Sequence, residues 1–202
     1  EFFLSATYYQ SAGQKEIYYP EFDPRISANP EAANGGRAQH ADAERASTFT
    51  GNLKLGDFTL AAFWSARMKQ VPTASFETIF NDGRERTRDY RGYFDLTYAH
   101  DFAGEVHVEG RTFWDIYSYY GDYPFQGSPT AILERDKLLG EWVGTEWHLA
   151  AKVFGRHVLV AGAEFRENLH QRQVNYYDLT PRQYLVDDDR DSHTSALYAQ
   201  GE

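Results

Sequence analysis

The side chains that could carry out acid–base chemistry are carboxylates on predicted β-strands. Two pairs are candidates, Glu109 with Asp115 and Glu146 with Glu164. A general acid and a general base must both come within hydrogen-bond reach of the reacting group. Charged residues inside a membrane protein also pair with one another for structural reasons. We favour the structural interpretation and expect no enzymatic activity.

Histidines and acidic runs are the candidates for metal binding. His148 and His170 could ligate a metal with nearby carboxylates, but the seven histidines lack the spacing of a metal site. Asp187, Asp188, Asp189 and Asp191 offer the oxygen ligands that Ca²⁺ prefers, without the glycine turn and terminal glutamate of a calcium loop. We interpret these residues as solvated or hydrogen-bonded, and we expect no metal site and no cofactor.

A serine, a histidine and an acid also stand side by side, at Asp191, Ser192 and His193. Neighbouring residues on a strand point to opposite faces of the sheet. These three therefore cannot converge in the way that a hydrolase triad does.

Aromatic side chains are frequent in segments that we expect to be long loops. They include Tyr18, Tyr19, Tyr123, Phe125, Tyr176 and Tyr177, with Tyr184 nearby. Such rings can contact a small-molecule ligand by stacking, and a tyrosine hydroxyl adds a hydrogen bond. The same rings could instead pack the loops against one another. The first six are our candidate ligand-binding residues.

Composition excludes several classes of protein. The 202 residues include 14 Phe, 15 Tyr and 4 Trp, although 25% are charged and the mean hydropathy is −0.65. Disordered chains are poor in aromatics, and a membrane helix needs roughly 18 consecutive apolar residues, far more than the run at residues 59–66. The net charge of −10 argues against nucleic acid as a partner. The absence of Cys excludes disulfides and thiolate metal sites.

Apolar residues recur at every second position through most of the chain, which is the period of a β-strand. We expect about eight antiparallel strands, joined alternately by short turns and long loops. The turns lie at residues 56–57, 100–104 and 154–156, and the loops at residues 11–45, 68–88, 120–137 and 170–191. Outer-membrane barrels have short periplasmic turns and long extracellular loops.

The same alternation separates charge from apolar side chains. The following charged residues all fall on one predicted face, which we expect to line the lumen: Arg67, Asp95, Glu109, Arg111, Asp115, Glu146, Glu164 and Arg166. Within hydrocarbon only helices and closed barrels satisfy every backbone polar group. The fold class that we expect is therefore all-β, an antiparallel transmembrane β-barrel segment of about eight strands.

Three short motifs resemble the barrel of TonB-dependent outer-membrane receptors. Val-Pro-Thr-Ala-Ser-Phe at residues 71–76 is followed by Phe80-Asn81-Asp82 and by Arg88-Asp89-Tyr90. Residues 160–166 are similar to a recurrent strand that ends in Gly-x-Glu-x-Arg. Residues 198–202 resemble a Tyr-x-Gln-Asp-Glu strand start, with Gly201 where the family usually has Asp. The ordered motifs extend from about residue 58 to residue 202.

The resemblance implies a function. It implies a barrel of about 22 strands, a plug domain in its lumen, and uptake of a scarce nutrient, such as a ferric siderophore or a similar metal chelate, with energy delivered by TonB through the plug. Residues 1–202 would be one partial barrel domain, without plug or signal peptide, in the bacterial outer membrane. Its partners would be outer-membrane lipid and the chelate, and the whole receptor would be a monomer.

Two alternatives remain open. One is a complete small eight-stranded outer-membrane barrel with a structural, adhesion or enzymatic role, in which the first strand pairs with the last. The other is a soluble all-β binding protein, since soluble strands share the same alternation.

Overall fold

The computed structural model describes residues 1–103, 105–155 and 157–201. Gly104, Arg156 and Glu202 lie outside these ranges, so the turns expected at residues 100–104 and 154–156 and the motif at residues 198–202 are described only in part. The large sheet is built from nine strands: β1 (Phe2–Ser11), β4 (Glu44–Leu55), β5 (Phe58–Gln70), β6 (Arg86–Phe102), β7 (Val106–Phe125), β8 (Ile132–Val153), β9 (His157–Tyr177), β10 (Gln183–Asp188) and β11 (Ser192–Gly201).

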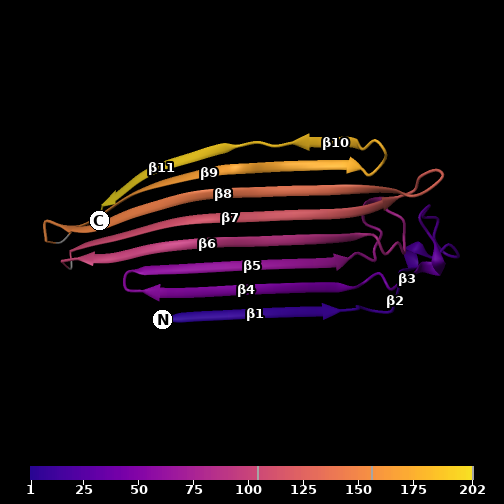
Figure 1. Ribbon diagram of the computed structural model, residues 1–202, viewed down its shortest axis with the longest axis horizontal. Coiled ribbons are helices and arrows are strands. Elements are labelled where there is room, and N and C mark those ends of the chain that lie inside the picture. Colours follow the sequence, from indigo (N-terminus) through magenta and orange to yellow (C-terminus); the bar gives the residue numbers. More distant parts are fainter. Residues whose placement is uncertain (104, 156, 202) are drawn as a thin grey trace.

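From β1 to β10 the sheet is an antiparallel meander in which each strand pairs with the large-sheet strand that precedes it in the chain (Figure 1). β10 pairs with residues 173–177 of β9 and β11 pairs with residues 159–168, so these two strands share one position beside β9. The sheet therefore has eight positions across, and the prediction of about eight antiparallel strands is confirmed.

The sheet does not close into a barrel. β1 pairs only with β4, and β10 and β11 pair only with β9, so both edges of the sheet are open. A complete eight-stranded barrel would need β1 beside β10 and β11. The alternative of a complete small eight-stranded barrel is therefore wrong for this structure.

Register is kept across the whole sheet, which separates its two faces. Residues paired across neighbouring strands lie on the same face, and the row through Leu4 continues to Gly51, Ala62, Phe94, Trp114 and Val143. We call this side the apolar face and the opposite side the polar face. An irregularity between Glu141 and Trp142 adds an extra residue to β9, and a second one lies between Tyr184 and Val186 of β10. The alternation predicted from the sequence is thus maintained over eight strand positions.

Two of the predicted loops are much shorter than expected. β7 continues to Phe125 and β8 begins at Ile132, where the sequence predicts a loop over residues 120–137. β9 continues to Tyr177 and β10 begins at Gln183, within the loop predicted over residues 170–191. Aromatic and polar residues broke the alternation used to predict strands, but the hydrogen-bond ladder continues through them because it satisfies the backbone whatever the side chain.

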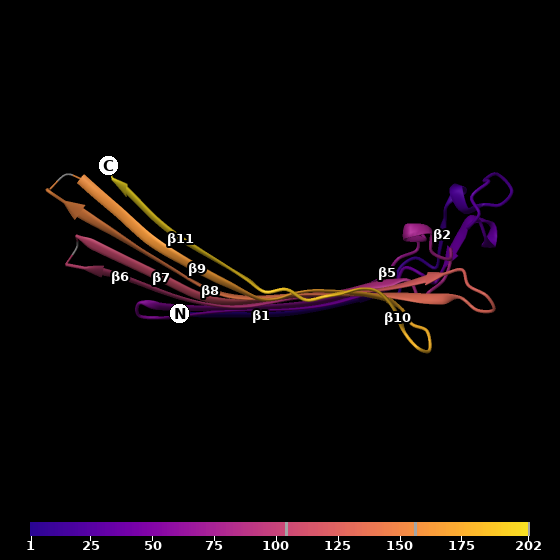
Figure 2. The same ribbon diagram turned by 90° about the horizontal axis from the view of Figure 1, so that it is seen from above.

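The other two connections form a compact body at one end of the sheet. They hold β2 (Glu16–Tyr18), β3 (Arg37–Gln39) and three short 3₁₀ turns, η1 (Pro20–Phe22), η2 (Asn34–Gly36) and η3 (Ser75–Glu77). Residues 12–43 and 71–85 together are called the loop cluster. Figure 2 shows that the sheet is a single layer along most of its length, with the loop cluster standing on one side. Among the described residues no helix is long and apolar enough to cross a membrane.

The loop cluster has the one compact apolar core of the described chain. The rings of Phe22 and Phe80 stack with centroids 4.3 Å apart, and Ala38 and Ala74 pack beside them. Tyr19 meets Phe80 edge-on at 6.1 Å. Phe80 comes from the second connection and Phe22 from the first, so this contact joins the two.

We expect Phe80→Ala to destabilise the loop cluster by about 3–5 kcal/mol, the usual cost of deleting a buried phenylalanine ring. Limited proteolysis should then cut within residues 12–43 much faster, while the β-sheet circular dichroism signal is unchanged. Ile26→Ala is the control, because Ile26 lies in the same segment with 70% of its surface exposed. Equal cleavage rates in the two variants would contradict the proposed core.

Candidate functional site

The polar face carries the charged residues that the sequence predicts to lie together. The register places all eight on this face: Arg67, Asp95, Glu109, Arg111, Asp115, Glu146, Glu164 and Arg166. They are spread over β5 to β9. The polar face therefore carries positive and negative charges spread over five strands, and these charges do not gather in one cluster.

Most of these charges are paired across neighbouring strands. Arg91 Nη2 donates to Asp115 Oδ1 at 2.5 Å, and Arg67 Nε donates to Glu44 Oε1 at 2.7 Å. Arg111 Nε donates to Asp95, and its Nη1 lies 3.6 Å from Glu146 Oε1. Charge-assisted hydrogen bonds of this kind fix side-chain orientation. The charges of the polar face thus neutralise one another over much of its width.

Trp142 adds an aromatic surface to the polar face. The guanidinium groups of Arg166 and Arg91 lie 4.8 and 5.0 Å from the centroid of its ring. Arg166 Nε also donates to Asn168 Oδ1 at 2.9 Å. Cation–π contacts and directed N–H donors together suit recognition of a polar or anionic ligand.

The two carboxylate pairs considered for acid–base chemistry differ in the separation of their members. Glu109 and Asp115 lie six positions apart on β7, which is about 20 Å along a strand. Glu146 and Glu164 lie directly opposite each other on β8 and β9. Like charges at such positions repel and destabilise the pair.

Residues of the acidic run pair with nearby basic side chains, and the adjacent Ser and His point to opposite faces. Asp188 pairs with Arg190 at 2.7 Å and Asp189 with His170 at 3.1 Å. Ser192 and His193 lie on opposite faces, opposite Asn168 and Glu167 of β9.

The predicted ligand-binding aromatics fall into two groups. Tyr18 lies in β2 and is 45% exposed, and Tyr19 follows it and packs on Phe80. The other four were expected in loops, and that placement is wrong: Tyr123 and Phe125 lie in β7, and Tyr176 and Tyr177 lie in β9.

Burial further limits these rings as ligand contacts. Tyr123 and Tyr176 are only 7% and 3% exposed. Phe76 of the loop cluster covers Tyr123 edge-on, with ring centroids 5.6 Å apart. Tyr123 thus packs the loop cluster onto the polar face, which is the second of the two roles that the sequence leaves open.

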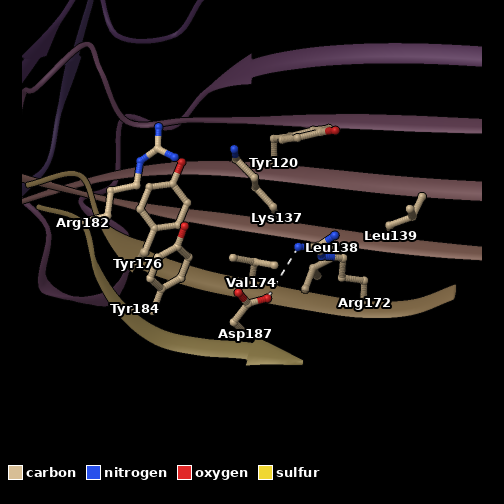
Figure 3. A pocket seen from close by; sticks show the side chains of 10 residues that line it. All are labelled: Tyr120, Lys137, Leu138, Leu139, Arg172, Val174, Tyr176, Arg182, Tyr184 and Asp187. Carbon is tan, nitrogen blue, oxygen red and sulfur yellow. Dashed lines mark ion pairs between the residues drawn. The ribbon is translucent and has the colours of Figure 1, made fainter. Parts of the chain in front are cut away.

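A pocket on the apolar face is a site that the sequence does not predict. It lies near the end of the sheet that carries the loop cluster, which we call the loop-bearing end. Its cavity volume is about 390 Å³, and Lys137, Arg172 and Arg182 bring cations to it (Figure 3). Tyr176 lies beneath two of them, with Lys137 Nζ 5.3 Å and Arg182 Cζ 5.1 Å from its ring centroid. Asp187 pairs with Arg172 at 3.6 Å. The pocket lies across β8, β9 and β10. Its residues come together through the register of these strands, which the sequence alone does not reveal.

A second basic group lies beside this pocket on the same face. Asp122 is 2% exposed and accepts hydrogen bonds from Arg86 at 2.8 Å, Arg88 at 3.1 Å and Arg135 at 2.8 Å. One carboxylate thus faces three guanidinium groups. The loop-bearing end of the apolar face is therefore rich in cations.

Comparison with protein-family models, curated proteins and solved structures finds no significant match to this chain.

Two buried carboxyl groups in the loop cluster have pKa values displaced in opposite directions. Hydrogen bonds from Arg25 and the hydroxyl of Tyr18 hold the pKa of Asp23 far below its ordinary value of 3.8. Burial raises the pKa of Glu85 above 4.5, although Thr78 and the backbone N–H of Ser75 donate hydrogen bonds to it. Asp23 therefore stabilises the cluster above pH 3.8, and this contribution is lost as pH falls. The stability contributed by Glu85 is present below pH 4.5 and is lost as pH rises through its folded pKa.

We expect the stability of the loop cluster to decline on both sides of about pH 4, within the range where these two groups titrate. Hydrogen exchange of residues 15–40, corrected for its intrinsic pH dependence, measures this local stability. Glu85→Gln should flatten the decline above pH 4.5 and leave the acid decline unchanged. A decline above pH 4.5 that is identical in the variant would show that Glu85 is not its source.

Proposed function

We propose that this chain is part of the barrel wall of a bacterial outer-membrane receptor that imports a scarce nutrient with energy from TonB. The observation that carries the proposal is the uncovered apolar face. Large apolar side chains on it are exposed in a single-layer sheet, with Leu4 at 64%, Phe94 at 56% and Leu197 at 85%. An apolar surface of this size would be expected to contact a partner or lipid.

The distribution of charge supports lipid as the partner. On the apolar face no Asp, Glu, Lys or Arg occurs at the alternate positions from Phe58 to Met68 of β5 or from Val106 to Tyr120 of β7. Charges on this face occur at Arg88, Asp122 and Lys137, and farther along β8 and β9 at Glu141 and Glu167. Glu141 accepts a hydrogen bond from Trp114 Nε1 at 2.8 Å. A tilted strand crosses the hydrocarbon in about 9–11 residues, which suits the length of the uncharged segment.

The turns and edges support a receptor barrel in particular. Turns close the strands at the end away from the loop cluster, and at the first of them Gly56 adopts φ +59°, as a two-residue hairpin turn requires. Strands of 20 to 22 residues are about twice as long as a bilayer needs, so their outer parts and the loop cluster would project outside the cell. The open edges would pair with further strands of a barrel of about 22.

The polar face would then line the lumen. Its ion pairs and its Arg and Trp surface would contact the plug domain, water and a passing ligand such as a ferric siderophore. The motifs at residues 71–76 and 160–166, which resemble TonB-dependent receptors, support this function. The cations at the loop-bearing end of the apolar face would lie at the level of lipid headgroups.

Two adjacent alanines of β5 test which face meets lipid. Ala62 lies on the apolar face, and Ala61 lies on the polar face opposite Asp95. We expect Ala62→Arg to lower the free energy of unfolding in lipid vesicles by about 2–4 kcal/mol, the cost of a lipid-facing arginine near mid-membrane. Ala61→Arg should have little effect, because water and Asp95 can satisfy the new charge. Heat-modifiable mobility on gels measures the folded fraction, and equal effects of the two substitutions would contradict the assignment of faces.

Uptake by cells tests the transport function itself. Cells that produce the whole receptor should grow on at least one member of a panel of ferric chelates supplied as the only iron source, and only when TonB is present. Cells that lack the receptor are the control. Growth that is independent of the receptor across a panel that also includes cobalamin would contradict nutrient uptake.

A further inference from the structure

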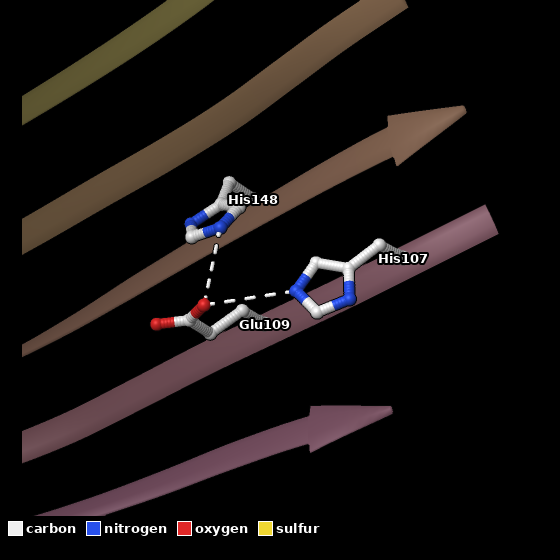
Figure 4. Close-up of side chains that lie close together, drawn as sticks. All are labelled: His107, Glu109 and His148. Atoms are coloured by element: carbon white, nitrogen blue, oxygen red, sulfur yellow. Dashed lines mark ion pairs between the residues drawn. The ribbon is translucent and has the colours of Figure 1, made fainter. Parts of the chain in front are cut away.

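Three potential metal ligands meet on the polar face, near the end of the sheet that lies away from the loop cluster. His107 and Glu109 lie two residues apart on β7, and His148 lies directly opposite Glu109 on β8 (Figure 4). Glu109 Oε2 is 3.5 Å from His148 Nε2 and 3.7 Å from His107 Nε2. The ligand atoms of the three residues all lie within 4.8 Å of one another.

These separations suit a shared metal ion better than direct hydrogen bonds. An N–H···O hydrogen bond spans about 2.7–3.2 Å, so neither imidazole is at hydrogen-bond distance from Glu109. Two ligands of a tetrahedral Zn²⁺, each about 2.1 Å from the ion, lie about 3.4 Å apart. Small side-chain movements would therefore bring all three atoms to coordination distance.

A fourth residue, Asp101, orients the imidazole of His107. His107 Nδ1 lies 2.8 Å from Asp101 Oδ1, at the end of β6. The Nδ1–H donates to this carboxylate, which leaves the Nε2 lone pair directed toward Glu109. A carboxylate that orients a histidine in this way is the usual second partner of a zinc-binding imidazole.

Other histidines in the described chain show what an ordinary imidazole–carboxylate pair looks like. His100 lies 2.9 Å from Asp57, and His170 lies 3.1 Å from Asp189. Each of these histidines meets one carboxylate at hydrogen-bond distance. Within residues 1–103, 105–155 and 157–201, the group at His107 is the one set of three ligands found.

We propose that His107, Glu109 and His148 bind one divalent transition-metal ion, with Zn²⁺ as the best fit, and that Asp101 positions His107. Two imidazoles and one carboxylate leave a coordination position for water or for a ligand atom. All three side chains are more than a third exposed, so an ion can reach them from solvent. The site depends only on the pairing of β7 with β8, and so it stands apart from the proposed transport function.

The test measures Zn²⁺ binding by the protein, purified in detergent without a polyhistidine tag. Competition with a chromophoric chelator gives the dissociation constant, and Co²⁺ absorption reports the coordination geometry. We expect Zn²⁺ to bind with a stoichiometry of one. His148→Ala and Glu109→Gln should each weaken binding by at least about 100-fold, and Asp101→Asn by about 10-fold, as loss of an outer-shell partner does.

His100→Ala is the matched control, because His100 also contacts one carboxylate near the same end of the sheet but lies on the apolar face. It should leave the dissociation constant unchanged. Circular dichroism verifies that each variant keeps its β-sheet. Zn²⁺ affinity that is unchanged in His148→Ala, or reduced as much by His100→Ala, would overturn the site.

Discussion

The backbone hydrogen-bond ladder between neighbouring strands is the constraint on which the rest of this structure depends. A single-layer sheet has no second layer to hold its strands in place, so register must come from the ladder and from side chains on the sheet itself. A slip of one residue would exchange the two faces of a strand. From β1 to β8 the register shows one continuous set of partners. Cross-strand ion pairs such as Arg91 with Asp115 hold this register from the polar side.

Much of the sheet could be predicted from the sequence because a strand has a period of two. Val106, Val108, Trp114 and Ile116 on one face of β7 are separated from Glu109 and Arg111 on the other by spacing alone. Once the faces were known, the eight charged residues could be placed on one side. The signal failed where function or packing interrupted the alternation, as at Tyr123 and Tyr176, whose rings are buried inside strands.

Contacts between distant segments could not be predicted in the same way. Lys137 and Arg182 meet Tyr176 only because β8, β9 and the hairpin to β10 are aligned as they are. The stacking of Phe22 on Phe80 depends on two loops with no periodic pattern. By contrast, His107, Glu109 and His148 were within reach of sequence reasoning: all three fall on predicted polar faces of adjacent strands, and only the register that sets His148 opposite Glu109 was missing.

The meander itself has a consequence for how such a sheet is made. From β1 to β10 each strand of the large sheet pairs with the large-sheet strand that precedes it in the chain, and β11 pairs with β9, so each new strand needs only a strand already in place as a template. Local pairings of this kind require short loop closures and lower the contact order, which favours rapid assembly. A gene could therefore widen the sheet by duplicating a hairpin. It could also vary a loop such as residues 12–43 without disturbing the strands already in place.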